Sequence, residues 1–244
     1  MRDLLMVIPS RGRPGNVARL SDAADATCEG DTWFEIGLDN DDPTAEHYPV
    51  GKRLTYTMEA DLHKVTAWCN HLAVPEATAF RYIGHFGDDN VPETPGWDVK
   101  IMEALEQTPF AFANDLYPGR EPGTLCCHVF MRSEVVRTLG YFGPPSIAHM
   151  YVDVAWMAWG RACGITYLHD VLIPHLHYTT GRSGNDATYQ NSYAGTGADL
   201  QAWHAYCRSG QLNEDIGKLG GRPYSDQELA EFNRGLNIPE VWPW

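Results

Sequence analysis

Short apolar runs of strand length recur along the first two-thirds of the chain, separated by segments with helical spacing. Gly, Pro, Asn or Asp follows most of these runs, as expected where strands end in turns. The alternation predicts an α/β fold with a mixed, mainly parallel sheet flanked by helices. We expect strands at 4–9, 32–38, 53–56, 80–86, 110–113, 124–131, 165–168 and 171–173. We expect helices at 16–26, 61–72, 97–105 and 133–139, with Pro75 ending the second and Ser133 capping the fourth.

The composition changes after residue 178, where Gly, Ser, Thr, Asn and Tyr become frequent. We therefore expect one domain over 1–178 and an extension over 179–244 that packs on the same domain. The extension should begin with a mobile loop at 179–197 and continue with helices at 200–209 and 225–235. The aromatic end at 239–244 predicts docking on the body or on a neighbouring copy, which would make the protein a homo-oligomer.

The most informative strand is the one at 80–86, because it runs directly into Gly87-Asp88-Asp89-Asn90. Adjacent carboxylates at the end of a buried strand repel each other, and desolvation adds to the cost. Mg²⁺ or Mn²⁺ offsets this cost, since both prefer carboxylate oxygens and can hold a diphosphate on their other face. An ordinary polar turn is the alternative interpretation of Asp-Asp-Asn.

Two further strands end in polar residues. The first ends at Pro9-Ser10-Arg11, and Asp39 follows the second. Ligands of open α/β sheets bind at the carboxyl edge, so these residues are expected beside the Asp88–Asp89 loop. A guanidinium suits diphosphate oxygens, and of the two arginines in the first turn we favour Arg11 over Arg13. Solvated turn charges are the alternative.

Composition narrows the class of protein. A hydrophobic content of 43% with 11% aromatic residues is typical of a globular chain. No apolar run approaches about 20 residues, and the N-terminus lacks a signal-peptide pattern, so we expect a cytoplasmic protein without a membrane span. The net charge of −14 argues against a large duplex-DNA footprint. Six cysteines without CxxC spacing favour reduced thiols over a zinc site.

The order of these motifs resembles that of a GT-A-fold glycosyltransferase of the family 2-like kind, over about two-thirds of the chain. The resemblance implies a nucleoside-diphosphate sugar as donor, with a UDP-sugar expected first, and Mn²⁺ or Mg²⁺ as cofactor. It implies that Asp88 approaches the ribose and Asp89 coordinates the metal. The remaining donor contacts that it implies come from Pro9, Ser10, Arg11, Asp39, Lys64 and Arg182.

The segment 147–164 resembles the acidic helix of these enzymes, with Val152 in place of the first acid. In inverting members the following Asp deprotonates the acceptor hydroxyl, a role that the resemblance gives to Asp153. A helix N-terminal acid favoured by the dipole is the alternative. Several GT-A enzymes also use a C-terminal His as a metal ligand. His175 and His177 are the candidates here, and His175 is preferred because it lies closer to the strand end.

Two other functions stay open. A sugar-1-phosphate nucleotidyltransferase also places carboxylates and a metal beside a nucleotide, although its Gly-rich first loop is poorly matched by Ser10–Pro14. A non-catalytic nucleotide- or sugar-binding module is the other. The acceptor is not identified by the sequence, and a protein, a saccharide, a lipid and a modified nucleobase all fit.

Overall fold

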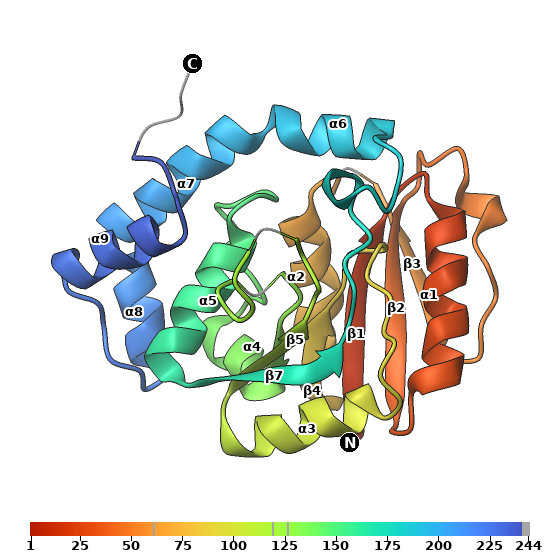
Figure 1. Cartoon of the computed structure of the whole chain (residues 1–244), viewed down its shortest axis with the longest axis horizontal. Helices are drawn as coiled ribbons and strands as arrows, with labels where there is room; N and C mark the ends of the chain where they lie inside the picture. Colours follow the sequence, from red (N-terminus) through yellow and green to blue (C-terminus); the bar gives the residue numbers. More distant parts are fainter. Residues whose placement is uncertain (61, 119, 126, 241–244) are drawn as a thin grey trace.

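The structure is a computed structural model that describes residues 1–60, 62–118, 120–125 and 127–240. Its centre is a seven-stranded sheet in the order β3-β2-β1-β4-β6-β5-β7 (Figure 1). Every neighbouring pair is parallel except those of β6, which runs antiparallel to β4 and β5. The strands are β1 (Arg2–Ser10), β2 (Thr32–Asp39), β3 (Leu54–Glu59), β4 (Phe80–His85), β5 (Phe110–Asn114), β6 (Phe130–Arg132) and β7 (Ile165–Leu172). The predicted α/β class and mainly parallel sheet are confirmed.

Helices cover both faces of the sheet, because side chains alternate along each buried strand. On β1, Leu4, Met6 and Ile8 pack against α1 (Pro14–Thr27) and α3 (Trp97–Gln107). Leu5 and Val7 belong to the other core, which α2 (Val65–Glu76), α4 (Ser133–Leu139) and α5 (Val152–Cys163) complete. Two short 3₁₀ turns, η1 (Ala45–His47) and η2 (Tyr178–Thr180), lie in the connections.

The C-terminal extension forms α6 (Ala187–Ala194), α7 (Thr196–Arg208), α8 (Gln211–Lys218) and α9 (Asp226–Gly235). Apolar side chains of α7, α8 and α9 join the core on the α5 side. The fully buried Asp215 of α8 accepts hydrogen bonds from Tyr141 and Tyr206, which fastens α8 to the body and to α7. In Figure 1, α6 and α7 arch over the sheet, and α6 lies above the carboxyl end of β1.

Several helices and strands predicted within residues 1–178 begin or end at other residues than expected. Among the described residues of 124–131, only Phe130 and Met131 belong to a strand, which is β6. The buried His128 instead accepts the backbone N–H of Ala113 through Nε2 (3.2 Å), so a side chain replaces ladder bonds. The strands expected at 165–168 and 171–173 are one strand, β7, whose register shifts between Ala113 and Asn114 of its partner.

The helix limits also differ. Pro75 does not end α2, because a proline in the last turn removes only one hydrogen bond, and the helix continues to Glu76. Ser133 is the first residue of α4 rather than its cap, which is Arg132. The segment 179–197 contains a helix, α6, although its mobility stays a prediction. Helix α8 was not predicted, whereas α9 has the expected capping box.

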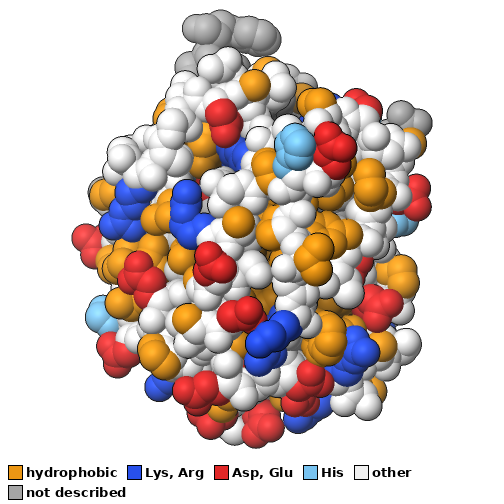
Figure 2. Space-filling view, turned by 90° about the vertical axis from the view of Figure 1, so that its right-hand side faces the viewer, with side chains coloured by type: hydrophobic (Ala, Val, Ile, Leu, Met, Phe, Trp, Pro, Cys, Tyr) orange, Lys and Arg blue, Asp and Glu red, His pale blue; other side chains and the backbone are white. Residues whose placement is uncertain are grey.

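Some expectations fall outside the described residues, namely those for Asp61, Cys126 and the aromatic end at 241–244. The other five cysteines are free thiols. None of the helices in the described part of the chain has the length and apolar character needed to cross a bilayer. Figure 2 shows basic side chains scattered among acidic ones on one face of the molecule.

Candidate active site at the carboxyl edge of the sheet

The loop after β4 and the segment after β7 are joined along their backbones at the carboxyl edge of the sheet. Asn90 and His175 form an isolated antiparallel bridge. The N–H of Leu176 donates to the carbonyl of Asp89 (2.8 Å), and the N–H of Val91 donates to that of Pro174 (3.0 Å). This pairing brings the predicted ligands Asp89 and His175 together from segments that are far apart in the sequence.

Asp88 is held by the turn between β1 and α1. Its buried carboxylate accepts hydrogen bonds from Ser10 Oγ (2.6 Å), Arg13 Nη1 (3.2 Å) and Asn16 Nδ2 (3.3 Å). Burial, followed by the charge of Asp89, raises the pKa of Asp88 to about 6. The repulsion between the two adjacent carboxylates therefore raises the pKa of Asp88 rather than that of Asp89. Ser10 lies at the site as predicted, while Pro9 pairs with Gly37 within the sheet.

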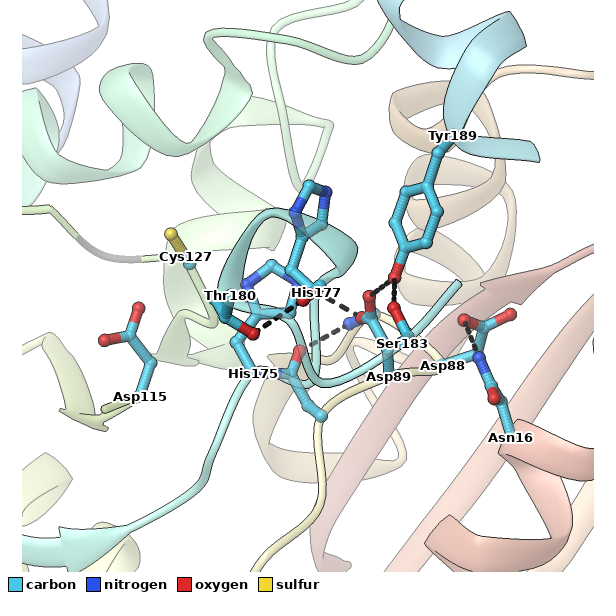
Figure 3. A network of polar contacts seen from close by, with 12 residues as sticks. Asn16, Asp88, Asp89, Asp115, Cys127, His175, His177, Thr180, Ser183 and Tyr189 are labelled. Atoms are coloured by element: carbon cyan, nitrogen blue, oxygen red, sulfur yellow. Dashed lines mark hydrogen bonds and ion pairs between the residues drawn. The ribbon is translucent and has the colours of Figure 1, made fainter. Parts of the chain in front are cut away.

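Asp89 lies between His175 and Tyr189 (Figure 3). Its Oδ1 is 3.2 Å from His175 Nε2, and its Oδ2 accepts a hydrogen bond from the Tyr189 hydroxyl (2.6 Å). Burial works against ionisation, but the charge of His175 and the hydrogen bonds of both partners hold the pKa of Asp89 well below its usual range. Despite its own burial, His175 has a pKa raised well above 6.5 by Asp89. The pairing thus favours the ionised carboxyl of Asp89 and the protonated ring of His175.

This arrangement fits a divalent cation. Two adjacent buried carboxylates leave an excess of negative charge, which the His175 imidazolium now balances. Deprotonated His175 Nε2 and Asp89 Oδ1 would offer nitrogen and oxygen ligands at one point, a donor set that suits Mn²⁺ and is also open to Mg²⁺. His177 is not at this point. Its ring packs on Tyr189 (4.5 Å between centroids), and its Nδ1 lies 2.7 Å from Thr179 Oγ1.

Asp39 has a separate set of partners at the end of β2. Its carboxylate accepts hydrogen bonds from Trp68 Nε1 (3.0 Å), the backbone N–H of His63 (3.2 Å) and Arg11 Nη1 (3.0 Å). Burial opposes ionisation, yet these hydrogen bonds lower the pKa of Asp39. Asp39, Asp41 and His63 converge closely enough to suggest a metal site, but the Arg11 guanidinium bridges both carboxylates there. Arg11 is therefore placed at Asp39, and it is Arg13 that reaches the Asp88–Asp89 pair.

Helix α6 covers the carboxylate pair. Arg13 donates to Asp186 at the start of α6 through Nε (2.8 Å) and Nη2 (2.7 Å), and its guanidinium lies 3.9 Å from the centre of the Tyr189 ring. Thr188 Oγ1 donates to the carbonyl of Arg11 (3.0 Å). The predicted donor ligands Lys64 and Arg182 are both exposed, at the start of α2 and between η2 and α6.

Asp153 lies in the first turn of α5, where its Oδ1 accepts the N–H of Val154 (2.9 Å). Its Oδ2 is 4.0 Å from Cys127 Sγ, and burial raises the pKa of Asp153. Arg120 donates to Cys127 Sγ (3.1 Å) and to Asp115. Figure 3 shows Asp115 and Cys127 on the side of His175 away from Asp88. The site thus has two sides, with Asp88 and Arg13 on one and Asp153, Cys127 and Arg120 on the other.

The sequence did not single out Tyr189 or Cys127. Tyr189 stands in a segment whose composition indicates a loop, and Cys127 belongs to a Cys-Cys pair with no recognisable spacing. No local pattern identifies either residue, because each reaches the site only through contacts between distant segments.

No protein-family model and no curated protein sequence matches the chain. Solved structures do match it. TarS of S. aureus superposes with a TM-score of 0.64 at 11% identity, over 98% of this chain and 44% of TarS, so the chain spans less than half of that protein. TarS residues 1–349 in complex with UDP-GlcNAc give a TM-score of 0.54 at 10% identity, over 98% of this chain and 82% of that one.

A mannosyltransferase from Pyrobaculum calidifontis, in complex with GDP-Man and Mn²⁺, matches with a TM-score of 0.52 at 10% identity, over 98% of this chain and 81% of that one. At identities this low, the matches establish the fold of the chain but not its activity or substrates. The sheet order, the helical layers and these matches together identify the fold of the chain as that of the GT-A glycosyltransferases.

Proposed function

We propose that the chain is a metal-dependent glycosyltransferase that moves a sugar from a nucleoside-diphosphate sugar to an acceptor hydroxyl with inversion. The observation that carries the proposal is the pairing of Asp89 with His175 at the carboxyl edge of a GT-A sheet. Two structural neighbours support it, because they were solved with nucleotide sugars, one of them together with Mn²⁺.

On the donor side, Asp89 and His175 would hold Mn²⁺ or Mg²⁺, and His175 would first lose the proton on Nε2. When bound, this ion offsets the charge that develops on the departing diphosphate. Arg13, whose guanidinium lies 3.2 Å from the Asp88 carboxylate, is suited to the diphosphate oxygens. Ser10, Asp88 and Asp39 would border the nucleoside, with Lys64 and Arg182 reaching the donor from the rim.

On the acceptor side, Asp153 would act as the general base. Its carboxylate takes the proton of the acceptor hydroxyl while that oxygen attacks the anomeric carbon. The new bond forms between the acceptor oxygen and the anomeric carbon, and the bond from this carbon to the diphosphate oxygen breaks on the opposite face. A carboxylate whose pKa is raised by burial is a better proton acceptor than an exposed one.

The test is a calorimetric titration of UDP, with and without Mn²⁺, of the wild-type protein and Asp89→Asn. We expect Mn²⁺-dependent binding in the wild type and its loss in Asp89→Asn. Asp170→Asn is the matched control, since Asp170 is an exposed carboxylate near the end of β7 and should keep binding. Binding that does not depend on Mn²⁺, or that survives in Asp89→Asn, would remove the proposal.

The products separate this function from nucleotidyl transfer. A glycosyltransferase incubated with UDP-glucose, UDP-GlcNAc or GDP-mannose passes the sugar to water or to an acceptor hydroxyl and releases the nucleoside diphosphate. A nucleotidyltransferase given a sugar 1-phosphate and a nucleoside triphosphate releases pyrophosphate instead. Pyrophosphate release by this protein would favour the second function.

A further inference from the structure

The C-terminal extension holds the segment that leads into the helix of Asp153. Asp199, in the first turn of α7, is buried, with 4% of its surface exposed. Its carboxylate accepts the backbone N–H groups of Ala148 (2.9 Å), His149 (3.0 Å) and Met150 (2.8 Å). A buried anion bound by three consecutive amides fixes the path of that backbone, because each freed N–H would lose its partner.

The segment 148–150 also determines where α5 begins. Tyr151, the N-cap of α5, has φ +70°, a left-handed conformation that a bulky residue adopts only when its surroundings impose it. Its carbonyl accepts the N–H of Ala155, the first hydrogen bond of the helix. Asp153 lies two residues beyond Tyr151, so a change in the path of 148–150 moves its carboxylate.

Residues 1–178 also contribute a hydrogen bond to this segment, in which the N–H of Thr66 donates to the carbonyl of Ala148 (3.1 Å). The amides themselves all face Asp199. We propose that Asp199 is a positioning residue, through which the C-terminal extension sets the placement of the Asp153 carboxylate. This inference rests on the proposed function, in which Asp153 is the base.

The experiment compares Asp199→Asn with the wild type, using Mn²⁺ and UDP-glucose, UDP-GlcNAc or GDP-mannose. Release of the nucleoside diphosphate is measured with water as the acceptor, whose proton Asp153 would take. Asparagine has the same shape but replaces one accepting oxygen with an amide nitrogen, so it cannot bind all three N–H groups. We expect turnover to fall about tenfold to a hundredfold, the effect of displacing a reacting group by about 1 Å. The donor KM and the Kd of UDP should change by less than about twofold.

Two further variants separate positioning from general stability. Asp215→Asn is the matched control, because Asp215 is also a buried aspartate of the extension but contacts Tyr141 and Tyr206 rather than 148–150. It should lower Tm while leaving turnover below Tm unchanged. In the Asp153→Asn background, Asp199→Asn should cause no further loss of turnover, since the group that it positions is gone.

An equal loss of turnover from Asp199→Asn in both backgrounds, or wild-type turnover in the single variant, overturns the inference. Should Asp199→Asn fail to fold, Asp199→Glu keeps the charge, shifts the oxygens by one methylene and is expected to give the same pattern.

Should the wild-type protein consume no nucleotide sugar, the proposed function fails, and a second readout still tests positioning. The ¹³C resonance of the Asp153 carboxyl, assigned by its loss in Asp153→Asn, reports the titration of that group. Asp199→Asn should displace its midpoint from the wild-type value. An unchanged midpoint overturns the inference.

Discussion

At the residue scale, the site is a set of buried and half-buried aspartates whose neighbours shift their pKa values in different directions. Asp88 faces Asp89 and has a raised pKa, whereas Asp89 faces His175 and Tyr189 and has a depressed one. Burial also raises the pKa of Asp153, where the charges of Arg120 and His175 oppose the rise. The same residue type therefore fits two different proposed roles. The depressed pKa of Asp89 suits cation binding, and the raised pKa of Asp153 suits proton transfer.

Asp153→Asn tests the second role. Asparagine keeps the shape of the side chain but cannot accept the acceptor's proton, so turnover should fall by roughly two to four orders of magnitude. Donor and Mn²⁺ affinity should stay nearly unchanged, because Asp89 and His175 form that part of the site. Steady-state kinetics and calorimetry on the same preparation measure both quantities. Wild-type turnover in Asp153→Asn would show that another group is the base.

The pH dependence of turnover also tests whether Asp153 is the general base. A base acts only when ionised, so turnover falls as the pH drops through the pKa of Asp153. Because burial raises this pKa above the ordinary value of 3.8, the acid limb of kcat/KM, which reports the free protein, should lie above that value. A pH–rate profile measures the limb, and it should disappear from the residual activity of Asp153→Asn. A limb that persists unchanged in the variant would belong to a different group.

Sequence patterns indicated Ser10, Asp39, Asp88, Asp89 and His175, because each ends or follows a strand and parallel strands end at one edge. They did not locate the partners of these residues. Arg13 rather than Arg11 contacts Asp88, and Tyr189 binds Asp89 from a helix formed a hundred positions later in the chain. Such pairings depend on how distant elements pack, and local periodicity carries no information about that.

At the element scale, α6 competes for the site that it covers. The Tyr189 hydroxyl donates to Oδ2 of Asp89 and so competes with a cation at Oδ1 for the charge of this carboxylate. Tyr189→Phe removes a hydrogen bond of about 1 kcal/mol from the ligand-free state, so Mn²⁺-dependent UDP binding should tighten about fivefold. Tyr193→Phe is the matched control on the same helix, and calorimetry measures both. Weaker binding in Tyr189→Phe would show that the hydroxyl assists the bound state.

Strand β2 passes under α2 with no room for a side chain at Gly37. A Cβ there would lie 2.4 Å from Cε3 of Trp68, the residue whose Nε1 donates to Asp39. Gly37→Ala should therefore displace the indole and destabilise the protein by about 1–3 kcal/mol. Gly15→Ala, at an exposed position of α1 with free space around it, should leave stability almost unchanged. Urea denaturation measures both, and equal midpoints would contradict the packing argument.

The elements that the sequence predicted well are those with a continuous apolar period, such as β1, β2, β4 and α3. The errors fall where side chains satisfy backbone groups or where helices are short. His128 replaces strand pairing before β6, and α6 forms in a segment rich in residues that favour turns. These outcomes follow from tertiary contacts that override weak local preferences.

At the scale of the whole molecule, neutral histidines buried beside the sheet should make the fold acid-labile. Burial lowers the pKa of His85 to about 3 and that of His128 to about 4. Since their unfolded values are near 6.5, the unfolded chain binds more protons below that pH. Stability should therefore decrease as the pH falls from about 6.5 towards the folded values.

Urea denaturation at about pH 7.5 and about pH 5 measures this loss. His85→Leu should reduce the difference between the two conditions, because it removes one of the titrating groups. His47→Leu, at an exposed position, should leave the difference as it is in the wild type. An unchanged difference in His85→Leu would assign the acid lability to other groups.

The bond between Asp199 and the segment 148–150 has a consequence for biosynthesis. The ribosome delivers the chain from the N-terminus, and the strands β1 to β4 can pair as soon as they emerge. The backbone of 148–150 becomes ordered much later, because its three N–H groups cannot bind the Asp199 carboxylate until α7 has left the exit tunnel. A nascent chain that already presents the Asp88–Asp89 loop would thus still lack an ordered start to α5. The activity proposed for Asp153 should accordingly begin only after α7 has been synthesised.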